Sequence, residues 1–252
     1  MSRLRFVAAL AAFVPLALAA APSLALSGTD KQEVEAIVRD YILQNPEIIQ
    51  QAMAELDKRR VAAEQAERKS GIDQNAKAIF DSPRQVVLGN PKGDVTLVEF
   101  FDYNCGYCRH AYSDLRRLMD EDPKLRVVLK EFPVLGPGSG EAAQVAVAVN
   151  EIAPEKYGAF HDALITGRGQ ADGARALAAA KSVGLDEADV RKAMQTALVN
   201  DTLTEVYGLA ERLGINGTPS YVVGDEVVVG AVGYDQLKKR IDSVRACGST
   251  TC

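Results

Sequence analysis

The chain has few cysteines and few histidines for its length. Only four of its 252 residues are cysteine and only two are histidine. Four cysteines are too few for a fold that depends on disulfides, and a chain of this length can bury a hydrophobic core of its own. The purpose of the cysteines therefore has to be inferred from their spacing.

The sequence also lacks a long basic stripe, an internal repeat and a low-complexity tract. Its formal charge is −5 at pH 7. Proteins that bind nucleic acid carry a basic patch, so nothing in this sequence predicts a nucleic-acid partner. Long apolar runs are scarce as well. The run at residues 6–21 is short for a membrane span, is interrupted by Pro15, and is not followed by a second one.

Residues 1–25 have the pattern of a secretory signal peptide. Arg3 and Arg5 precede the apolar run, and residues 23–25 (Ser-Leu-Ala) offer a small-x-small cleavage site, with residues 19–21 as an alternative site. An uncleaved membrane anchor is the other interpretation of this segment. We therefore expect export to an oxidising compartment, where cysteine pairs persist.

Cys105 and Cys108 form a C-x-x-C motif between a predicted strand and a predicted helix. The apolar residues 95–101 precede the motif, and the helical pattern of residues 109–119 follows it. This is the local layout of a thioredoxin-type redox site. A cysteine in the first turn of a helix faces unpaired N–H groups and the positive end of the helix dipole, which stabilise a thiolate. The thiolate is the form that attacks disulfides.

Other uses of this cysteine pair have to be weighed. A closed zinc site needs four ligands, and Cys247 and Cys252 offer a second pair, although they lie in a Gly/Ser/Thr-rich tail. Haem attachment needs C-x-x-C-H, and it fails here because Arg109 stands in place of the histidine. A purely structural disulfide is a further alternative.

The region between residues 26 and 80 has helical periodicity and reads as an N-terminal oligomerisation region. Apolar residues recur at helical spacing on both sides of Asn45-Pro46, which should stop or kink the helix, and Gly71 is expected to break it again. Helices of this kind cannot bury their own apolar faces. We expect them to pack on copies of themselves; packing on the chain's own domain is the alternative.

A thioredoxin-like pattern follows this region. The expected strands are residues 85–88, 95–101, 125–132, 220–223 and 226–229, with helices at 109–120 and 234–244, a Gly/Pro loop at 133–140, and a helical block from 141 to 213 interrupted at residues 154, 167–173 and 184. Gly224-Asp225 suits a two-residue hairpin turn. The order predicts an α/β, thioredoxin-like fold with an inserted all-helical domain and an N-terminal helical extension. Its thioredoxin-like domain comprises residues 83–138 and 214–246, and the insertion comprises residues 139–213.

Thr218 and Pro219 are expected to lie beside Cys105. A proline at the start of a strand is tolerated only where its missing N–H does no harm. A cis bond before Pro219 turns the backbone of Thr218 toward the thiols and leaves an edge to which an extended peptide can add. We therefore predict a cis Thr218–Pro219 bond, although a trans bond is the commoner case.

Glu99 is the second residue expected beside the thiols. It shares one face of its strand with Val95, Leu97 and Phe101, so it should be buried beneath the start of the helix. A lone buried carboxyl group destabilises the fold unless it takes part in catalysis or forms an ion pair. Glu99 is therefore a candidate proton relay for Cys108. Lys130, on the next strand, is a candidate partner for Glu99, but we expect it to face solvent.

The two histidines are His110 and His161. His110 lies just after the C-x-x-C motif, where it adds positive charge or a soft-metal ligand, but a plain surface position on the helix is the expectation. The tail cysteines, Cys247 and Cys252, are close enough in the sequence for a local disulfide, and we assign them no catalytic part.

Three segments together resemble the DsbA-like family of periplasmic thiol–disulfide oxidoreductases: residues 100–108 (Phe-Phe-Asp-Tyr-Asn-Cys-Gly-Tyr-Cys), 130–136 (Lys-Glu-Phe-Pro-Val-Leu-Gly) and 217–220 (Gly-Thr-Pro-Ser). The resemblance covers roughly residues 83–245, and that family also inserts a helical block into a thioredoxin fold. Residues 41–46 (Tyr-Ile-Leu-Gln-Asn-Pro) are similar to the N-terminal extension of the ScsC and Com1-like subgroup. In that subgroup the extension can trimerise the protein.

The resemblance implies roles for individual residues. Cys105 is the attacking thiol, Cys108 the resolving thiol and Glu99 the buried acid, while Thr218 and Pro219 form the cis-proline loop. The dedicated oxidases have Pro-His between the cysteines and Val before the cis-proline. This chain has Gly106-Tyr107 and Thr218 instead, which is similar to the disulfide isomerase DsbC. Without the motif histidine the disulfide should be less oxidising.

The sequence thus predicts an exported, oligomeric disulfide isomerase or reductase that acts on misoxidised client proteins. Its catalytic residues are Cys105, Cys108 and Glu99, and Tyr107, Thr218 and Pro219 contact the substrate. We expect no cofactor or metal beyond the redox-active disulfide, and a membrane redox partner that recycles the thiols. A monomeric dithiol oxidase is one alternative, and a copper-binding or copper-tolerance protein that uses the same thiols is another.

Overall fold

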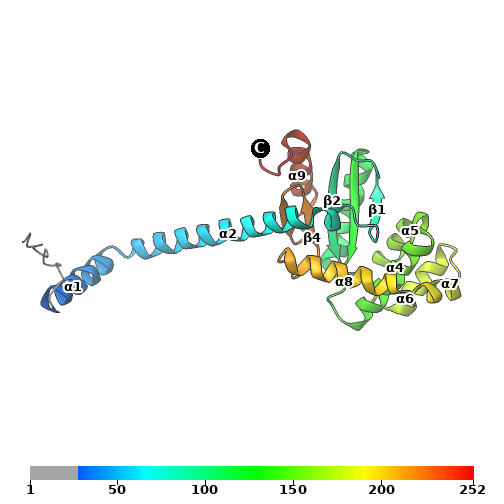
Figure 1. Cartoon of the computed structure of the whole chain (residues 1–252), viewed down its shortest axis with the longest axis horizontal. Helices are drawn as coiled ribbons and strands as arrows, with labels where there is room; N and C mark the ends of the chain where they lie inside the picture. Colours follow the sequence, from blue (N-terminus) through cyan, green and yellow to red (C-terminus); the bar gives the residue numbers. More distant parts are fainter. Residues whose placement is uncertain (1–27) are drawn as a thin grey trace, which may run out of the picture. The chain divides into compact units, whose positions relative to one another are not determined.

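The computed structural model describes residues 28–252, so the predicted signal peptide, residues 1–25, lies outside the described residues. The described chain divides into two compact units between Asp57 and Lys58 (Figure 1). Within residues 28–252, no helix combines the length and the hydropathy that crossing a membrane requires.

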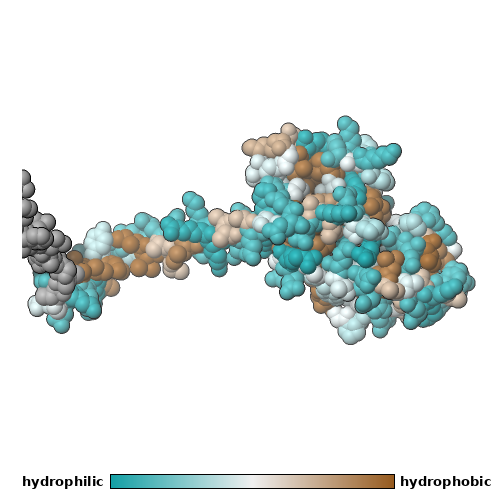
Figure 2. All heavy atoms as spheres, viewed as in Figure 1, coloured by the Kyte–Doolittle hydropathy of each residue, from teal (hydrophilic) through white to brown (hydrophobic). Residues whose placement is uncertain are grey.

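The first unit consists of helix α1 (Gly28–Gln44) and the first part of helix α2 (Glu47–Phe80). The break between them falls at Asn45-Pro46, as predicted, and the side chain of Asn45 donates a 2.8 Å hydrogen bond to the carbonyl of Tyr41. α1 has no buried residue. Apolar side chains are exposed along both helices (Figure 2), among them Val34, Ile37, Val38, Tyr41, Leu43, Ile49, Met53, Leu56 and Val61. We call these nine residues the apolar stripe.

The predicted helix break at Gly71 is wrong, because α2 continues through this residue to Phe80. Gly71 serves close packing. A Cβ atom at this position would lie 2.9 Å from the carbonyl oxygen of Arg212 at the end of another helix. Beyond it, Ile72 and Ile79 are the buried residues of α2. The glycine therefore lets the second half of α2 approach the fold closely instead of ending the helix.

The second unit is built on a five-stranded sheet of order β1-β3-β2-β4-β5. The strands are β1 (Val86–Gly89), β2 (Val95–Phe101), β3 (Leu125–Glu131), β4 (Ser220–Val223) and β5 (Glu226–Val229). β2 and β3 are parallel, and the other pairs are antiparallel. Gly224, between β4 and β5, has φ 54° and so adopts the predicted turn. The central strand β2 is apolar on both faces because helices cover the sheet on both sides.

The second unit also contains the last part of α2, from Lys58, and seven further helices: α3 (Gly106–Glu121), α4 (Pro137–Ile152), α5 (Pro154–Ile165), α6 (Gly173–Ser182), α7 (Glu187–Ala193), α8 (Ala197–Arg212) and α9 (Tyr234–Cys247). α5, α6 and α7 pack around α4 (Figure 1), and α3 contacts α9. The α/β thioredoxin-like fold with a helical segment between β3 and β4 is as predicted. α4 begins inside the predicted loop 133–140, because Pro137 at its first turn needs no N–H partner.

The two faces of the sheet belong to two cores. Leu97 and Phe101 of β2 lie in the larger core, with α3 and the helical block, and Val98 and Phe100 lie in the smaller one, with the end of α2 and α8. This alternation follows from the two-residue period of a strand. It sets Glu99 on the face covered by α3, with Val95, Leu97 and Phe101, as predicted.

Both expectations for Lys130 are wrong. Its side chain is only 2% exposed, and the strand register pairs it with Phe100, on the face opposite to Glu99. The Nζ atom donates hydrogen bonds to the carbonyl of Ala78 (2.8 Å) and to the side chain of Gln85 (3.3 Å). Lys130 is buried because the end of α2 covers this face of the sheet, and the Ala78 carbonyl of α2 accepts a hydrogen bond from its ammonium group.

Candidate active site

Cys105 and Cys108 lie where β2 gives way to α3, and both are free, buried cysteines. Cys105 is the N-cap residue of α3, and its sulfur accepts a 3.4 Å hydrogen bond from the backbone N–H of Cys108. The sulfur therefore sits at the positive end of the helix, where backbone donors favour a negative charge. This is the position that the spacing of the motif predicted.

The Thr218–Pro219 peptide bond is cis, as predicted. The Cys105 thiol donates a 3.2 Å hydrogen bond to the carbonyl oxygen of Thr218. The N–H of Gly230 bonds to the carbonyl of Pro219 at 2.9 Å, and the hydroxyl of Ser220 bonds to the carbonyl of Gly217 at 2.8 Å. The loop between the last helix of the block and β4 is thus held directly beside the first thiol.

Glu99 lies beneath the start of α3, with 4% of its surface exposed. Burial raises its pKa to about 8, and a hydrogen bond with Tyr221 opposes the rise. Burial also raises the pKa of Cys108, the nearby Glu99 charge raises it further, and the backbone of Asp102 lowers it. The two groups share a dry environment in which each disfavours the charge of the other.

Asp102 is a residue of this site that the sequence reasoning missed. Its carboxylate is 1% exposed and accepts four hydrogen bonds. Oδ1 accepts from the N–H of Asn104 and the hydroxyl of Ser139, and Oδ2 accepts from the N–H groups of Val134 and Leu135. Asp102 thereby ties the C-x-x-C loop to the loop after β3. An Asp directly after a central strand and before a C-x-x-C motif was the available signal, since such a residue caps loops.

A second buried polar group also escaped the sequence reasoning. The Tyr157 hydroxyl donates a 2.5 Å hydrogen bond to Glu131, and the Tyr103 hydroxyl lies 3.2 Å from that of Tyr157 and 3.0 Å from Nδ1 of His161. Burial raises the pKa of Glu131 to about 8 and lowers that of His161 to about 3. The His161 ring is therefore neutral. No motif marks this network, because its members come from three separate elements.

The remaining motif residues lie at the surface. Tyr107 is 71% exposed beside the thiols. His110 is exposed on α3 and its Nδ1 lies 2.7 Å from the carbonyl of Gly106, so it has the surface position that we predicted. Arg109 donates hydrogen bonds to the carbonyls of Tyr103 (3.2 Å) and Gly169 (2.8 Å). These bonds join the start of α3 to the helical block.

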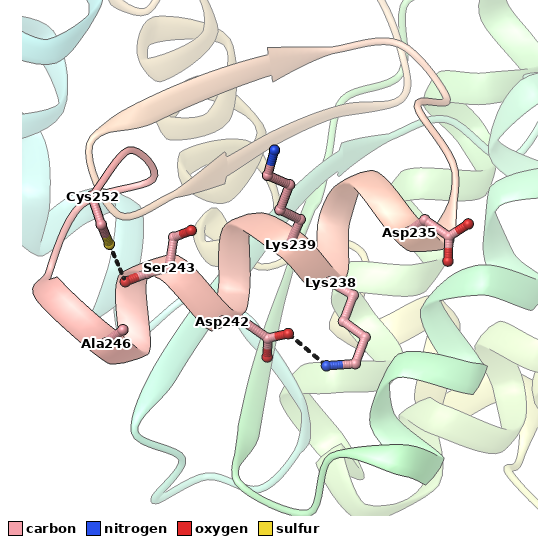
Figure 3. Close-up of a pocket in the computed structure, with 7 residues that line it drawn as sticks. All are labelled: Asp235, Lys238, Lys239, Asp242, Ser243, Ala246 and Cys252. Atoms are coloured by element: carbon pink, nitrogen blue, oxygen red, sulfur yellow. Dashed lines mark hydrogen bonds and ion pairs between the residues drawn. The ribbon is translucent and has the colours of Figure 1, made fainter.

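The tail cysteines form a disulfide, Cys247–Cys252. The tail is held by Asp225, which accepts hydrogen bonds from Ser249 and Thr250. A surface pocket lies along α9 where the chain ends (Figure 3), lined by Asp235, Lys238, Lys239, Asp242, Ser243, Ala246 and Cys252. Neither residue of the C-x-x-C pair lines this pocket. Over residues 28–252, no group of three or more histidine, cysteine or acidic side chains is placed to hold a metal ion.

The family model of the DSBA-like thioredoxin domain matches residues 96–242, a span that contains the motif, the cis-proline loop and the helical block. The chain belongs to this family. It is thus a DsbA-like protein. A second model, the N-terminal domain of the copper resistance protein ScsC, matches residues 30–63. The resemblance drawn from the sequence is confirmed on both counts.

Solved structures of DsbA-like proteins agree with this assignment. A thioredoxin-like oxidoreductase from Silicibacter pomeroyi is 44% identical, with a TM-score of 0.66 over 69% of this chain and 99% of that one. A linker-deletion mutant of ScsC from Proteus mirabilis is 29% identical, with a TM-score of 0.68 over 89% of this chain and 99% of that one. The match to ScsC extends into the N-terminal helical region.

Curated relatives include longer proteins. An Na⁺/H⁺ antiporter, NhaA 1, from Salinispora arenicola is 28% identical over 66% of this chain, which spans only 26% of the antiporter. Disulfide bond formation protein D of Bacillus subtilis is 27% identical over 63% of this chain and 76% of the relative.

Proposed function

We propose that this DsbA-like protein is an exported disulfide isomerase or reductase that acts on client proteins through Cys105 and Cys108. One observation carries the proposal: the Cys105 sulfur lies at the N-cap of α3 and 3.2 Å from the Thr218 carbonyl. A client sulfur that approaches Cys105 therefore meets a backbone edge at Thr218. An extended peptide can pair with such an edge through its main chain.

The first step is attack of the Cys105 thiolate on a client disulfide. A new S–S bond forms between Cys105 and one client sulfur, and the other client sulfur leaves as a thiolate. In isomerisation, a client thiolate can first exchange with another client disulfide, which frees a new client thiolate and leaves Cys105 bound. A client thiolate then attacks the client sulfur of the mixed disulfide, a client disulfide forms, and Cys105 leaves as a thiolate. In reduction, Cys108 attacks Cys105, the client leaves as a thiolate, and the Cys105–Cys108 disulfide must be reduced by an electron donor. We assign that reduction to a membrane redox partner.

Four further features support the remaining parts of the proposal. Glu99 is the buried acid beside Cys108, suited to take its proton. Tyr107, exposed beside Cys105, is suited to contact the client. The apolar stripe supports self-association: its side chains include Ile37, 61% exposed, and Leu56, 64% exposed. Apolar residues at this density on a helix favour a partner helix. The signal-like N-terminus supports a periplasmic location.

The test pairs light scattering with refolding of a scrambled multi-disulfide substrate in a glutathione buffer. We expect an oligomer that restores native disulfides, loss of activity in Cys105→Ala, and accumulation of a mixed disulfide in Cys108→Ala. The double variant Cys247→Ser/Cys252→Ser is the matched control and should keep full activity. A monomer with a reduction potential near the −120 mV of strong oxidants would instead establish the dithiol oxidase.

A second candidate function is Cu(I) binding by Cys105 and Cys108. It is favoured by the match of residues 30–63 to the N-terminal domain of a copper resistance protein. Soft thiolates select Cu(I). Titration with a Cu(I) chelator in competition measures it directly. Tight binding that disappears in Cys105→Ser, together with no activity on scrambled disulfides, would establish copper binding in place of the isomerase.

A further inference from the structure

A narrow internal space adjoins Cys108 and Glu99. Its lining residues are Glu99, Phe101, Cys108, Tyr112, His161 and Ile165. Four of them belong to β2 and α3, but His161 and Ile165 belong to α5 in the helical block. The space has no room for a water molecule. The helical block therefore supplies one wall of the compartment that holds the second sulfur.

The α5 wall is packed and anchored. Ile165 is 1% exposed and His161 is 2% exposed. The His161 ring packs edge-on against Phe101 and Tyr112, with centroids 5.0 and 5.1 Å apart. Its Nδ1 atom is hydrogen-bonded to Tyr103 at 3.0 Å. These contacts fix the ring in place and leave Ile165 as the purely apolar part of the wall.

Among the described residues, 28–252, no lysine or arginine lines the compartment. The titratable groups that face Cys108 and Glu99 are Cys105 at the N-cap of α3, Tyr112 in α3, Tyr221 in β4 and His161 in α5. Burial lowers the pKa of His161 to about 3, so this ring is neutral. Glu99 forms no ion pair with any residue between 28 and 252. Exclusion of water is therefore the main influence on the charge of these two groups.

We propose that Ile165 and His161 are positioning residues that exclude water from Cys108 and Glu99 and thereby prolong the mixed disulfide between Cys105 and a client. This inference rests on the proposed function, in which Cys108 ends that mixed disulfide. To do so, Cys108 gives its proton to the ionised form of Glu99, its thiolate bonds to the Cys105 sulfur, and the client sulfur leaves with the electron pair. In a dry compartment both charged species are scarce, so this step is slow. A slow release leaves the client's own thiols time to attack, which favours isomerisation over reduction.

The first test measures the ionisation of Cys108 without any client. In a Cys105→Ala background Cys108 is the only free thiol, and its alkylation rate is followed between about pH 6 and about pH 10. With Ile165 in place, we expect the midpoint of this rise to lie above that of a free cysteine thiol, because burial raises the pKa of Cys108. Ile165→Ala opens room for water beside Cys108, and the midpoint should fall by about one pH unit, which gives about tenfold more thiolate at a given pH. Easier access of the reagent scales the whole curve but does not move its midpoint.

Leu164→Ala is the matched control. Leu164 is the neighbouring residue of α5, 2% exposed, and does not line the space. Its truncation makes a similar cavity elsewhere in the core, so the profile should stay unchanged in shape. Ile165→Val is a milder variant that should shift the midpoint in the same direction if Ile165→Ala fails to fold. His161→Phe keeps a ring in the wall and should leave the midpoint unchanged. An unshifted profile in both Ile165 variants, or an equal shift in Leu164→Ala, would overturn the inference.

The second test measures the lifetime of the mixed disulfide in chains that retain Cys105. Ile165→Ala should shorten it about tenfold, in proportion to the added thiolate. If the midpoint shifts but the lifetime does not, Cys108 is not the resolving thiol. That result contradicts the proposed function and the kinetic half of the inference, and it leaves the water-excluding wall itself established. If the alkylation midpoint does not shift in the Ile165 variants, only the water-excluding role of Ile165 and His161 is contradicted, and the proposed function is not.

Discussion

The hydroxyl of Ser139 donates a 2.8 Å hydrogen bond to the buried carboxylate of Asp102. This bond joins the residue that follows β2 to the first turn of α4. The same carboxylate accepts the N–H groups of Val134 and Leu135, at 2.9 and 3.0 Å. The loop in front of Cys105 and the loop after β3 are therefore held by one side chain, and the C-x-x-C motif is placed by the helical block as well as by the sheet.

Asp102→Asn should destabilise this arrangement. Either orientation of the amide sets an NH₂ group against two donors, because both carboxylate oxygens accept two hydrogen bonds. We expect a loss of about 1–3 kcal/mol in the free energy of unfolding, measured by urea denaturation. Ser139→Ala, which removes only one donor, should cost less. Equal losses in the two variants would show that Asp102 is not the centre of the connection.

Glu99→Gln should slow the release of the mixed disulfide by about 100-fold, because glutamine cannot take the proton of Cys108. Burial raises the pKa of Glu99 to about 8. The release rate of the unsubstituted protein should therefore rise with pH up to about 8 as this carboxyl ionises. Quenched-flow measurement across this range checks the rise, which should vanish in the variant. A rate that is unaltered by the substitution would leave Glu99 with a structural role only.

Glu99→Gln should also change how stability depends on pH. The native pKa of Glu99 is raised from 4.5 to about 8, so the native state binds more protons than the unfolded state between these values. Its contribution to stability is complete below pH 4.5 and is lost as the pH rises through about 8. The variant should therefore gain stability relative to the unsubstituted protein over this window, as measured by denaturation at a series of pH values. A difference in the free energy of unfolding that does not change with pH would indicate that the fold does not raise the pKa of Glu99.

The contribution of Lys130 to the free energy of unfolding should depend on pH in the opposite direction. Burial lowers its pKa from 10.5 to about 8, so the unfolded state binds more protons between these values. The free energy of unfolding should rise with pH through this window, relative to Lys130→Met, by about 3 kcal/mol at most. Lys77→Met, at an exposed position near the end of α2, is the control and should show no such trend. Parallel curves for the unsubstituted protein and Lys130→Met would contradict the burial of the ammonium group.

The apolar stripe can be tested by a single charge. Met53 is 61% exposed within the stripe, and Met53→Glu would set a carboxylate against an apolar partner face. We expect dissociation of the oligomer by light scattering and a lower rate of disulfide isomerisation. Gln51→Glu adds the same charge to a polar, exposed position of the same helix, and it should leave the mass unchanged. Retention of the oligomer in Met53→Glu would show that the apolar stripe does not form the interface.

Much of the site could be predicted because its signals are local. The C-x-x-C motif lies between a strand pattern and a helix pattern, so the capping position of Cys105 follows from the chain itself. The cis bond at Thr218 and the burial of Glu99 followed from a proline at a strand start and from a two-residue period. The exposed apolar stripe was visible as helical periodicity without a covering partner.

The predictions that the structure contradicts, and the contacts that no sequence pattern indicates, depend on packing between distant segments. The sequence pattern predicts a helix break at Gly71, but in the fold this glycine permits the close approach of α2 to Arg212. Lys130 was expected in solvent, and only the position of α2 over its face of the sheet buries it. A hydrogen bond of Asp102 links residues 32 positions apart in the chain, and His161 and Ile165 adjoin Glu99 and Cys108 from a different segment.

The amino-acid sequence alone determined the kind of chemistry, because a thiol pair at a strand–helix junction and a proline loop are written in neighbouring residues. Only the tertiary structure decided how dry the second sulfur is and which helix keeps it dry. Burial and charge depend on every element packed around a group, and no local pattern records which elements those are.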